Sequence, residues 1–161
     1  MNPPPDHLLD EVWNLAHEAR DAGEVPVGAI VCRLPESDES PWEVLGRGRN
    51  RILENRDPSA HAELEAVREA CAALNSERLA RCALITNLEP CLMCSGALVL
   101  ARVEAIFYFT PVGSGFGLLD VLELPRTREK ALNHSPRAVL LDSQSERAST
   151  FLRNFFRERR K

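Results

Sequence analysis

Two short segments decide the fold of this chain: Pro90-Cys91-Leu92-Met93-Cys94 and, 30 positions earlier, His61-Ala62-Glu63. Each stands where a helix is expected to begin. Apolar residues recur at helical spacing from Ala60 to about Leu74. Pro90 is followed by small and apolar residues as far as Leu100, and proline is favoured in the first turn of a helix. The two segments therefore place one histidine, one glutamate and two cysteines at two helix starts.

These residue types suit a catalytic zinc ion, which takes three protein ligands and keeps a fourth position for water. Cys91 and Cys94 are three positions apart, so a helix brings them to one face. In the first turn of a helix, free N–H groups and the helix dipole favour thiolates. His61 is the candidate third ligand. Glu63 is the candidate catalytic residue, which would take a proton from the attacking water and pass it to a leaving amine.

The cysteine pair has two other interpretations when it is considered alone. A thioredoxin-like redox pair also stands at a helix start, but it would give His61 and Glu63 no role. A structural zinc ion would need a fourth ligand, for which the candidates are Cys32, Cys71, Cys82 and His134. The three cysteines in that set lie in apolar patterns and are more simply explained as buried thiols. The combined pattern H-x-E…P-C-x-x-C is the signature of zinc-dependent nucleobase deaminases.

Around these segments, helical and strand patterns alternate. Asp6 follows three prolines and is expected to N-cap a first helix that ends at Gly23. The order of elements predicts an α/β fold, a layered α/β/α sandwich with helices on both faces of a sheet. Residues 51–59 are expected to be irregular. Strands are expected over 27–34, 43–50, 83–86, 103–109 and 137–141, and further helices over 118–124 and from about 145 to 159.

Length and composition indicate one globular domain over residues 1–161. The chain has 161 residues, of which 44% are hydrophobic and 27% are charged. Its apolar runs are far shorter than the ~20 residues of a membrane span, and the start Met-Asn-Pro-Pro-Pro-Asp does not resemble a signal peptide. The five cysteines are an odd number without framework spacing, which favours a reducing, cytoplasmic location.

Charge is distributed unevenly along the chain. The formal net charge of −4 argues against a nonspecific nucleic-acid coat protein. The last eleven residues, however, carry five basic residues and one acidic residue and so have a net charge of +4, which leaves −8 for the rest. This basic tail offers both phosphate contacts and aromatic or arginine stacking surfaces to a single-stranded RNA loop, with Phe151, Leu152 and Phe155 expected to dock the helix and Arg153, Arg157 and Arg160 expected to point outward. The simpler alternative is that its apolar residues dock the helix while the arginines are solvated.

The motifs resemble those of bacterial tRNA adenosine deaminases, a branch of the cytidine-deaminase-like superfamily. The resemblance covers nearly the whole chain. The matching segments are Glu24-Val25-Pro26-Val27-Gly28-Ala29, Asn50, Asp57-Pro58-Ser59-Ala60-His61-Ala62-Glu63, Leu88-Glu89-Pro90-Cys91-Leu92-Met93-Cys94-Ser95-Gly96-Ala97 and Phe155-Phe156-Arg157-Glu158-Arg159-Arg160.

This resemblance implies a mixed five-stranded sheet between helices and a homodimer. It also implies the hydrolysis of adenosine to inosine at the wobble position of a tRNA anticodon. His61, Cys91 and Cys94 would bind one Zn²⁺ per subunit and Glu63 would transfer the proton. Asn50 would hydrogen-bond the flipped base. The other expected contacts to the tRNA anticodon loop are Phe156, Arg157 and Arg160.

Two departures from the family pattern stand out. The loop Thr110–Gly117, which borders the substrate channel in the family, is shorter here and carries no charge. Asn87 stands where the family usually has threonine. The uncharged loop favours an alternative function, the deamination of a free nucleobase or nucleoside of the guanine or cytosine type. A non-enzymatic RNA-binding module with a structural zinc ion is a further alternative.

Overall fold

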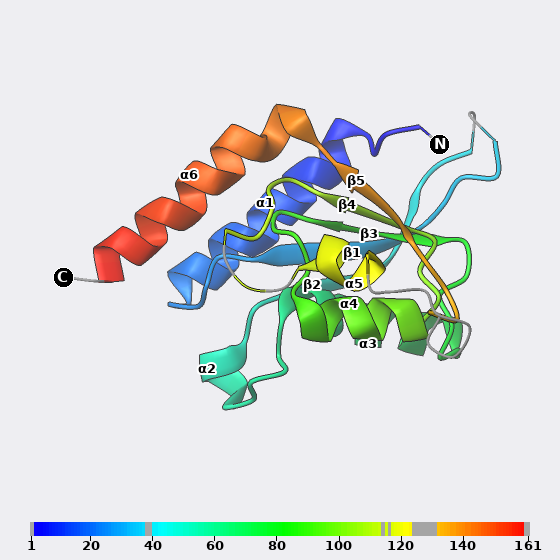
Figure 1. Cartoon of the computed structure of the whole chain (residues 1–161), viewed down its shortest axis with the longest axis horizontal. Coiled ribbons are helices and arrows are strands. Elements are labelled where there is room, and N and C mark those ends of the chain that lie inside the picture. Colours follow the sequence, from blue (N-terminus) through cyan, green and yellow to red (C-terminus); the bar gives the residue numbers. More distant parts are fainter. Residues whose placement is uncertain (1, 38–39, 114, 116, 124–131, 160–161) are drawn as a thin grey trace.

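Five strands form one mixed sheet in the order β2-β1-β3-β4-β5, which confirms the predicted α/β class and the mixed five-stranded sheet (Figure 1). The computed structural model describes residues 2–37, 40–113, 115, 117–123 and 132–159. Strand β1 pairs antiparallel with β2 and β3, whereas β3, β4 and β5 are parallel. The strands are β1 Gly28–Arg33, β2 Glu43–Arg49, β3 Cys82–Thr86, β4 Ala105–Tyr108 and β5 Arg137–Leu140.

Helices cover both faces of this sheet and form the outer layers of the sandwich (Figure 1). Helices α1 and α6 lie on one face, and α3 and α4 lie on the other, with the short α5 beside α4. Two hydrophobic clusters fill the spaces between the layers, one on each face of the sheet. The helices are α1 Asp6–Asp21, α2 Ile52–Asn55, α3 Ala62–Leu74, α4 Leu92–Leu100, α5 Leu118–Leu122 and α6 Asp142–Arg159.

Helix α3 lies directly on the backbone of β2. A Cβ atom on Gly46 would overlap the carbonyl oxygen of Ala66, and one on Gly48 would overlap that of Ala62. Ala62, Ala66 and Ala70 are buried and recur every four residues, so they form one face of the helix. Because neither this face of β2 nor the alanine face of α3 carries a large side chain, the backbones of β2 and α3 are in contact. This contact places the first turn of α3 at the end of β2.

The predicted elements are present, and the differences concern where helices begin and one additional short helix. Asp6 is the first residue of α1 and not its N-cap, because Pro5 occupies the cap position without a side-chain hydrogen bond. Likewise Cys91, not Pro90, is the residue that precedes α4. Helix α2 lies in the stretch expected to be irregular. Helix α6 starts at Asp142, whereas the sequence placed the start at about 145.

Among the described residues, no helix is long and apolar enough to cross a membrane.

Candidate metal centre and substrate pocket

The structure brings the three predicted ligands together at the starts of α3 and α4. His61 and Cys91 are the N-cap residues of these helices, and Cys94 lies in the first turn of α4. The Nδ1 atom of His61 lies 3.7 Å from Sγ of Cys91 and 3.6 Å from Sγ of Cys94. All three ligand atoms lie within 4.8 Å of one another. The predicted residues therefore converge on one point although the chain separates them by 30 positions.

These distances fit a tetrahedral zinc ion. Zinc–nitrogen bonds of about 2.0 Å and zinc–sulfur bonds of about 2.3 Å place tetrahedral nitrogen and sulfur ligands about 3.5 Å apart. The measured separations of 3.6 and 3.7 Å are close to that value. Among the described residues, no fourth His, Cys, Asp or Glu joins the group. His61, Cys91 and Cys94 thus offer three ligands, the number that a catalytic site uses.

The ionisation of the two thiols also fits a cation. Hydrogen bonds from Cys94 and His61 lower the pKa of the Cys91 thiol to about 3, so Cys91 is a thiolate at neutral pH. The hydrogen bond to Cys91 and burial raise the pKa of Cys94 above its ordinary value. Two thiolates this close repel each other, and a bound dication allows both to ionise. The hydrogen bond to Cys91 raises the pKa of His61.

Glu63 is enclosed beside this cluster. It belongs to the first turn of α3, two residues after His61, and only 3% of its surface is exposed. Burial raises the pKa of its carboxyl to about 7. A carboxyl group with a pKa near neutrality can both accept and return a proton, which general acid–base catalysis requires.

The structure places Asn50 at the junction of β2 and α3. Its side chain is 4% exposed, and its Oδ1 atom accepts a hydrogen bond of 2.9 Å from the backbone N–H of Ala62. Because Oδ1 is used by this contact, the amide nitrogen Nδ2 is the atom with donors for a further partner. Asn50 is therefore tied to the same helix start that carries His61 and Glu63.

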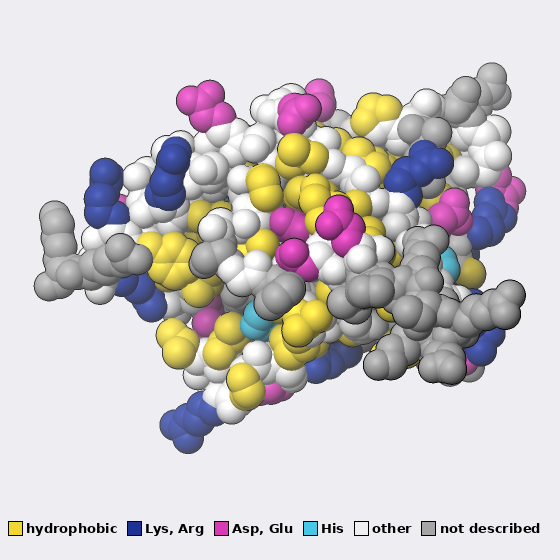
Figure 2. Space-filling model, viewed as in Figure 1, with side chains coloured by type: hydrophobic (Ala, Val, Ile, Leu, Met, Phe, Trp, Pro, Cys, Tyr) yellow, Lys and Arg dark blue, Asp and Glu magenta, His cyan; other side chains and the backbone are white. Residues whose placement is uncertain are grey.

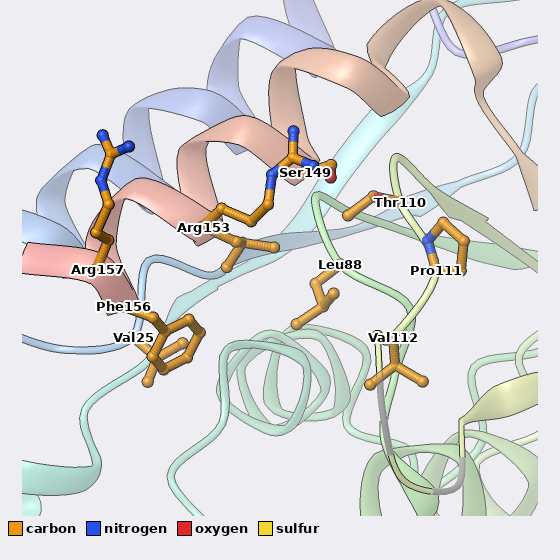
Figure 3. A pocket seen from close by; sticks show the side chains of 11 residues that line it. Val25, Leu88, Thr110, Pro111, Val112, Ser149, Arg153, Phe156 and Arg157 are labelled. Carbon is orange, nitrogen blue, oxygen red and sulfur yellow. The ribbon is translucent and has the colours of Figure 1, made fainter. Parts of the chain in front are cut away.

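A pocket of about 590 Å³ lies between α6 and the loop that follows β4. Val25 and Leu88 are among its lining residues, Thr110 and Val112 belong to the loop side, and Phe156 projects from α6 (Figure 3). The metal ligands are not among its lining residues, but Leu88 stands only three positions before Cys91. Most of the lining is apolar, and the charged groups are Arg153 and Arg157 on α6.

The basic tail is partly docked and partly exposed. Leu152 and Phe155 are buried against the core, at 8% and 6% exposure, so the apolar residues of the tail do dock the helix. Phe156 is 45% exposed and lines the pocket together with Val25, whereas the side chains of Arg153 and Arg157 project from α6 (Figure 3). Arg160 lies outside the described residues.

Two buried carboxylates near the site were missed by sequence reasoning. Glu24, at 2% exposure, accepts hydrogen bonds from the backbone N–H groups of Leu53 and Glu54 at the start of α2. Glu89, at 4% exposure, accepts two from the region that follows β4. Each stands next to a residue that lines the pocket, Val25 or Leu88. The sequence feature that could have predicted such a buried carboxylate is a glutamate flanked by apolar residues, such as Glu89 between Leu88 and Pro90.

Asn87, the departure from the family pattern, joins two strands. Its Oδ1 atom accepts a hydrogen bond of 2.8 Å from the N–H of Gly28, and its Nδ2 atom donates one of 2.9 Å to the carbonyl of Pro26. It is fully buried. The amide therefore connects the end of β3, from which the metal segment continues, to the start of β1.

Comparison with known sequences identifies one family. Residues 5–110 match the cytidine and deoxycytidylate deaminase zinc-binding region. A tRNA-specific adenosine deaminase of Aquifex aeolicus is 38% identical over 155 residues, which are 96% of this chain and 95% of that protein.

Two solved structures share the fold. One comes from work on A-to-I editing by tRNA:A34 deaminases at the wobble position of transfer RNA. It has a TM-score of 0.71 and 30% identity, and the match covers 84% of this chain and 97% of that one. A guanine deaminase from Bacillus subtilis has a TM-score of 0.59 and 29% identity, covering 96% of this chain and 95% of that one.

Proposed function

The chain belongs to the cytidine and deoxycytidylate deaminase zinc-binding family, and on that premise we propose that it converts adenosine to inosine at the wobble position of a tRNA anticodon. The reaction is a zinc-dependent hydrolysis that releases ammonia. The observation that carries the proposal is the cluster of His61, Cys91 and Cys94 beside the buried Glu63. The near full-length relative from Aquifex aeolicus, a tRNA-specific adenosine deaminase, supports tRNA as the substrate.

Each residue of the cluster has a definite part in the reaction. His61, Cys91 and Cys94 hold one zinc ion per subunit. When bound, zinc supplies a Lewis acid that makes water nucleophilic at neutral pH. Glu63 takes a proton from the attacking water and delivers it to the exocyclic amine, which leaves as ammonia. Asn50 orients the extruded base by donating from Nδ2, because its Oδ1 atom is bound to Ala62.

The C-terminal helix contacts the anticodon loop in this proposal. An exposed aromatic ring can stack on an unpaired base, and exposed arginines can bind the phosphates that flank it. Phe156 offers the ring, and Arg157 and Arg160 offer the charges. Phe156 and Arg157 line the pocket beside Leu88, so α6 and the metal segment border the same space. A cytoplasmic location is part of the proposal, and a tRNA substrate supports it.

A homodimer is the proposed assembly. Helix α4 is apolar on nearly all sides, yet Leu92, Met93 and Leu100 are 56%, 39% and 72% exposed. Leu119 of α5 adds another exposed apolar side chain, at 44%. Figure 2 shows hydrophobic side chains exposed at several places on this face of the molecule, including near the start of α4. An apolar helix beside the active centre favours burial against a second copy.

Deamination of a free nucleobase is the second candidate. It is favoured by the uncharged pocket wall at Thr110–Gly113 and by the likeness to a guanine deaminase. The third possibility, an RNA-binding module with a structural zinc ion, requires a fourth protein ligand. Among the residues that the structure describes, neither Cys32, Cys71, Cys82 nor His134 joins the cluster.

One experiment separates these functions. The zinc-loaded protein is incubated with an adenosine-34 anticodon stem-loop, with guanine and with cytosine, and ammonia is measured in each case. The proposal expects ammonia from the stem-loop alone, with inosine found at the wobble position by sequencing. Ammonia from a free base but not from the stem-loop supports the second candidate. No ammonia from any substrate contradicts both enzyme assignments.

A further inference from the structure

Glu89 is a buried carboxylate whose hydrogen bonds connect the metal segment to the loop side of the pocket. Its Oε2 atom accepts a hydrogen bond of 3.0 Å from the N–H of Val112, and its Oε1 atom accepts one of 3.0 Å from the N–H of Leu119. Its own N–H donates to the carbonyl of Thr110 at 2.8 Å. These three contacts all go to the segment that follows β4.

Gly117 lies against the same carboxylate. A Cβ atom on Gly117 would come within 2.5 Å of the Oε1 atom of Glu89. The backbone of Gly117 also forms an antiparallel bridge with Cys91. The segment after β4 therefore contacts both Glu89 and a predicted metal ligand, and Glu89 is placed between the pocket wall and the metal centre.

Two of the three residues that Glu89 contacts, Thr110 and Val112, belong to the wall of the pocket, and the third, Leu119, belongs to α5. Thr110 and Val112 line the pocket on the side opposite α6, and Leu88, next to Glu89 in the chain, lies between the two sides (Figure 3). Residues 110–113, all of which the structure describes, carry the side chains of this wall and belong to no strand. The hydrogen bond from Val112 to the Glu89 carboxylate holds the backbone of this segment in place, and the bond from Leu119 ties the same carboxylate to the start of α5.

We propose that Glu89 is a positioning residue for the deaminase reaction, because its carboxylate sets the position of the Thr110–Gly113 wall relative to Cys91. This inference rests on the proposed function. Glu89 does not touch the substrate in this scheme, and it acts through Val112 and Leu119. Substrate binding therefore depends on Glu89 more strongly than the chemical step does.

The Glu89→Gln variant tests the contact with minimal change in size. A carboxylate accepts from two N–H groups, whereas a carboxamide offers one acceptor and places an NH₂ group against the other donor. Either Val112 or Leu119 then loses its partner. Amide hydrogen exchange at these two residues is expected to accelerate, while zinc content stays at the wild-type level. KM for the anticodon stem-loop is expected to rise about tenfold, the effect of one lost charge-assisted hydrogen bond, while kcat changes less than about twofold.

Ile30→Val is the matched control for general destabilisation. Ile30 is fully buried on the opposite face of the sheet, in the cluster with α1. The loss of one methyl group there costs stability without touching the pocket wall. Exchange at Val112 and Leu119 and KM for the stem-loop should both stay at wild-type values in this variant.

Gly117→Ala disturbs the same contact, between the Glu89 carboxylate and the segment after β4, without changing Glu89 itself. The backbone at Gly117 is extended, with φ −104° and ψ −168°, so alanine adopts it without strain. The new methyl group displaces the Glu89 carboxylate, and the variant is expected to repeat the exchange and KM changes of Glu89→Gln. This second variant keeps the proposal testable if Glu89→Gln does not fold.

Wild-type KM with unchanged exchange in either variant overturns the proposal. A similar rise of KM in Ile30→Val also overturns it, because the effect would then come from lost stability alone. If the wild-type protein releases no ammonia from the stem-loop, it is the proposed function that fails. The exchange rates of Val112 and Leu119 still report in that case whether Glu89 holds the wall.

Discussion

The Oδ1 atom of Asn50 accepts a hydrogen bond of 2.9 Å from the backbone N–H of Ala62, the residue between His61 and Glu63. The side chain expected to orient the substrate is thus bound to the helix start that carries His61, a predicted metal ligand, and Glu63, the proposed proton carrier. One amide joins the two tasks, with its oxygen used for structure and its nitrogen for binding. Substitution of Asn50 can separate the structural hydrogen bond of Oδ1 from the proposed substrate contact of Nδ2.

Asn50→Asp and Asn50→Ala should differ in stability more than in activity. Aspartate keeps an acceptor for Ala62 but loses the donor to the base, so the free energy of unfolding is expected to stay close to wild type. Alanine loses both, and leaving the buried N–H of Ala62 unpaired is expected to cost about 1–2 kcal/mol. Both variants should lose most ammonia release from the stem-loop. Urea unfolding and ammonia assays measure the two effects, and full activity in Asn50→Asp would contradict the role of Nδ2.

Glu63→Gln should abolish catalysis while zinc stays bound. Glutamine fills the same space but cannot accept and return a proton, so kcat for the stem-loop is expected to fall by at least about 10²-fold. Zinc content is measured by metal analysis. Glu65→Gln is the matched control, since Glu65 lies on the same turn of α3, forms an ion pair with Arg68 and is not part of the cluster. Substantial activity in Glu63→Gln would remove Glu63 from the mechanism.

Removal of zinc should lower thermal stability as well as activity. The three ligands join the starts of α3 and α4, and a ligand at 1,000 times its Kd stabilises the folded state by about 4 kcal/mol. The melting temperature is therefore expected to fall by about 10 °C in a strong chelator and to recover when zinc, but not magnesium, is added. Cys91→Ser should lose zinc, whereas Cys71→Ser, outside the cluster, should keep it. An unchanged melting temperature in the chelator would argue against a bound metal.

Leu100→Glu should convert the proposed dimer into a monomer. Leu100 is 72% exposed on α4, and a carboxylate at the centre of an apolar interface remains unpaired. Light scattering is expected to report half the wild-type mass. The corresponding change Phe156→Glu on α6, where the ring is 45% exposed, should leave the mass unchanged. A wild-type protein that is monomeric would end the dimer proposal without affecting the metal site.

Arg157→Ala should weaken RNA binding and make it less sensitive to salt. Loss of one phosphate contact on a single strand lowers the slope of log K against log salt concentration by about 0.7. Truncation of the tail is a poorer test, since Leu152 and Phe155 are buried in the core. Arg33→Ala is the control, because Arg33 is paired with Glu43 at the far end of β1. An unchanged salt slope would show that α6 does not hold the RNA backbone.

The order of elements was accessible from the sequence because it depends on local spacing. The metal cluster was accessible because the combined pattern H-x-E…P-C-x-x-C is a known signature that pairs two segments distant in the chain. Cys91 and Cys94 share a helical turn, and His61 begins the neighbouring helix. What could not be predicted depends on partners distant in the chain. Helix α2 forms because Glu24 accepts from Leu53 and Glu54, about 30 positions away. The role of Glu89 likewise could not be predicted, because it depends on hydrogen bonds from Val112 and Leu119, which are distant in the chain.

The glycines of β2 have a consequence for how such enzymes diversify. Because Gly46 and Gly48 lie beneath the alanines of α3, the backbone of β2 is in direct contact with the backbone of α3. No large side chain sets the distance between β2 and α3 at this contact. Substitutions elsewhere in the core are therefore expected to leave the position of Glu63 unchanged. The pocket wall, by contrast, depends on a side-chain contact, the hydrogen bond from Val112 to Glu89. Selection can therefore reshape substrate choice through the wall while the hydrolytic centre keeps its geometry, and laboratory evolution should find specificity variants in Thr110–Gly113 before it finds them in α3.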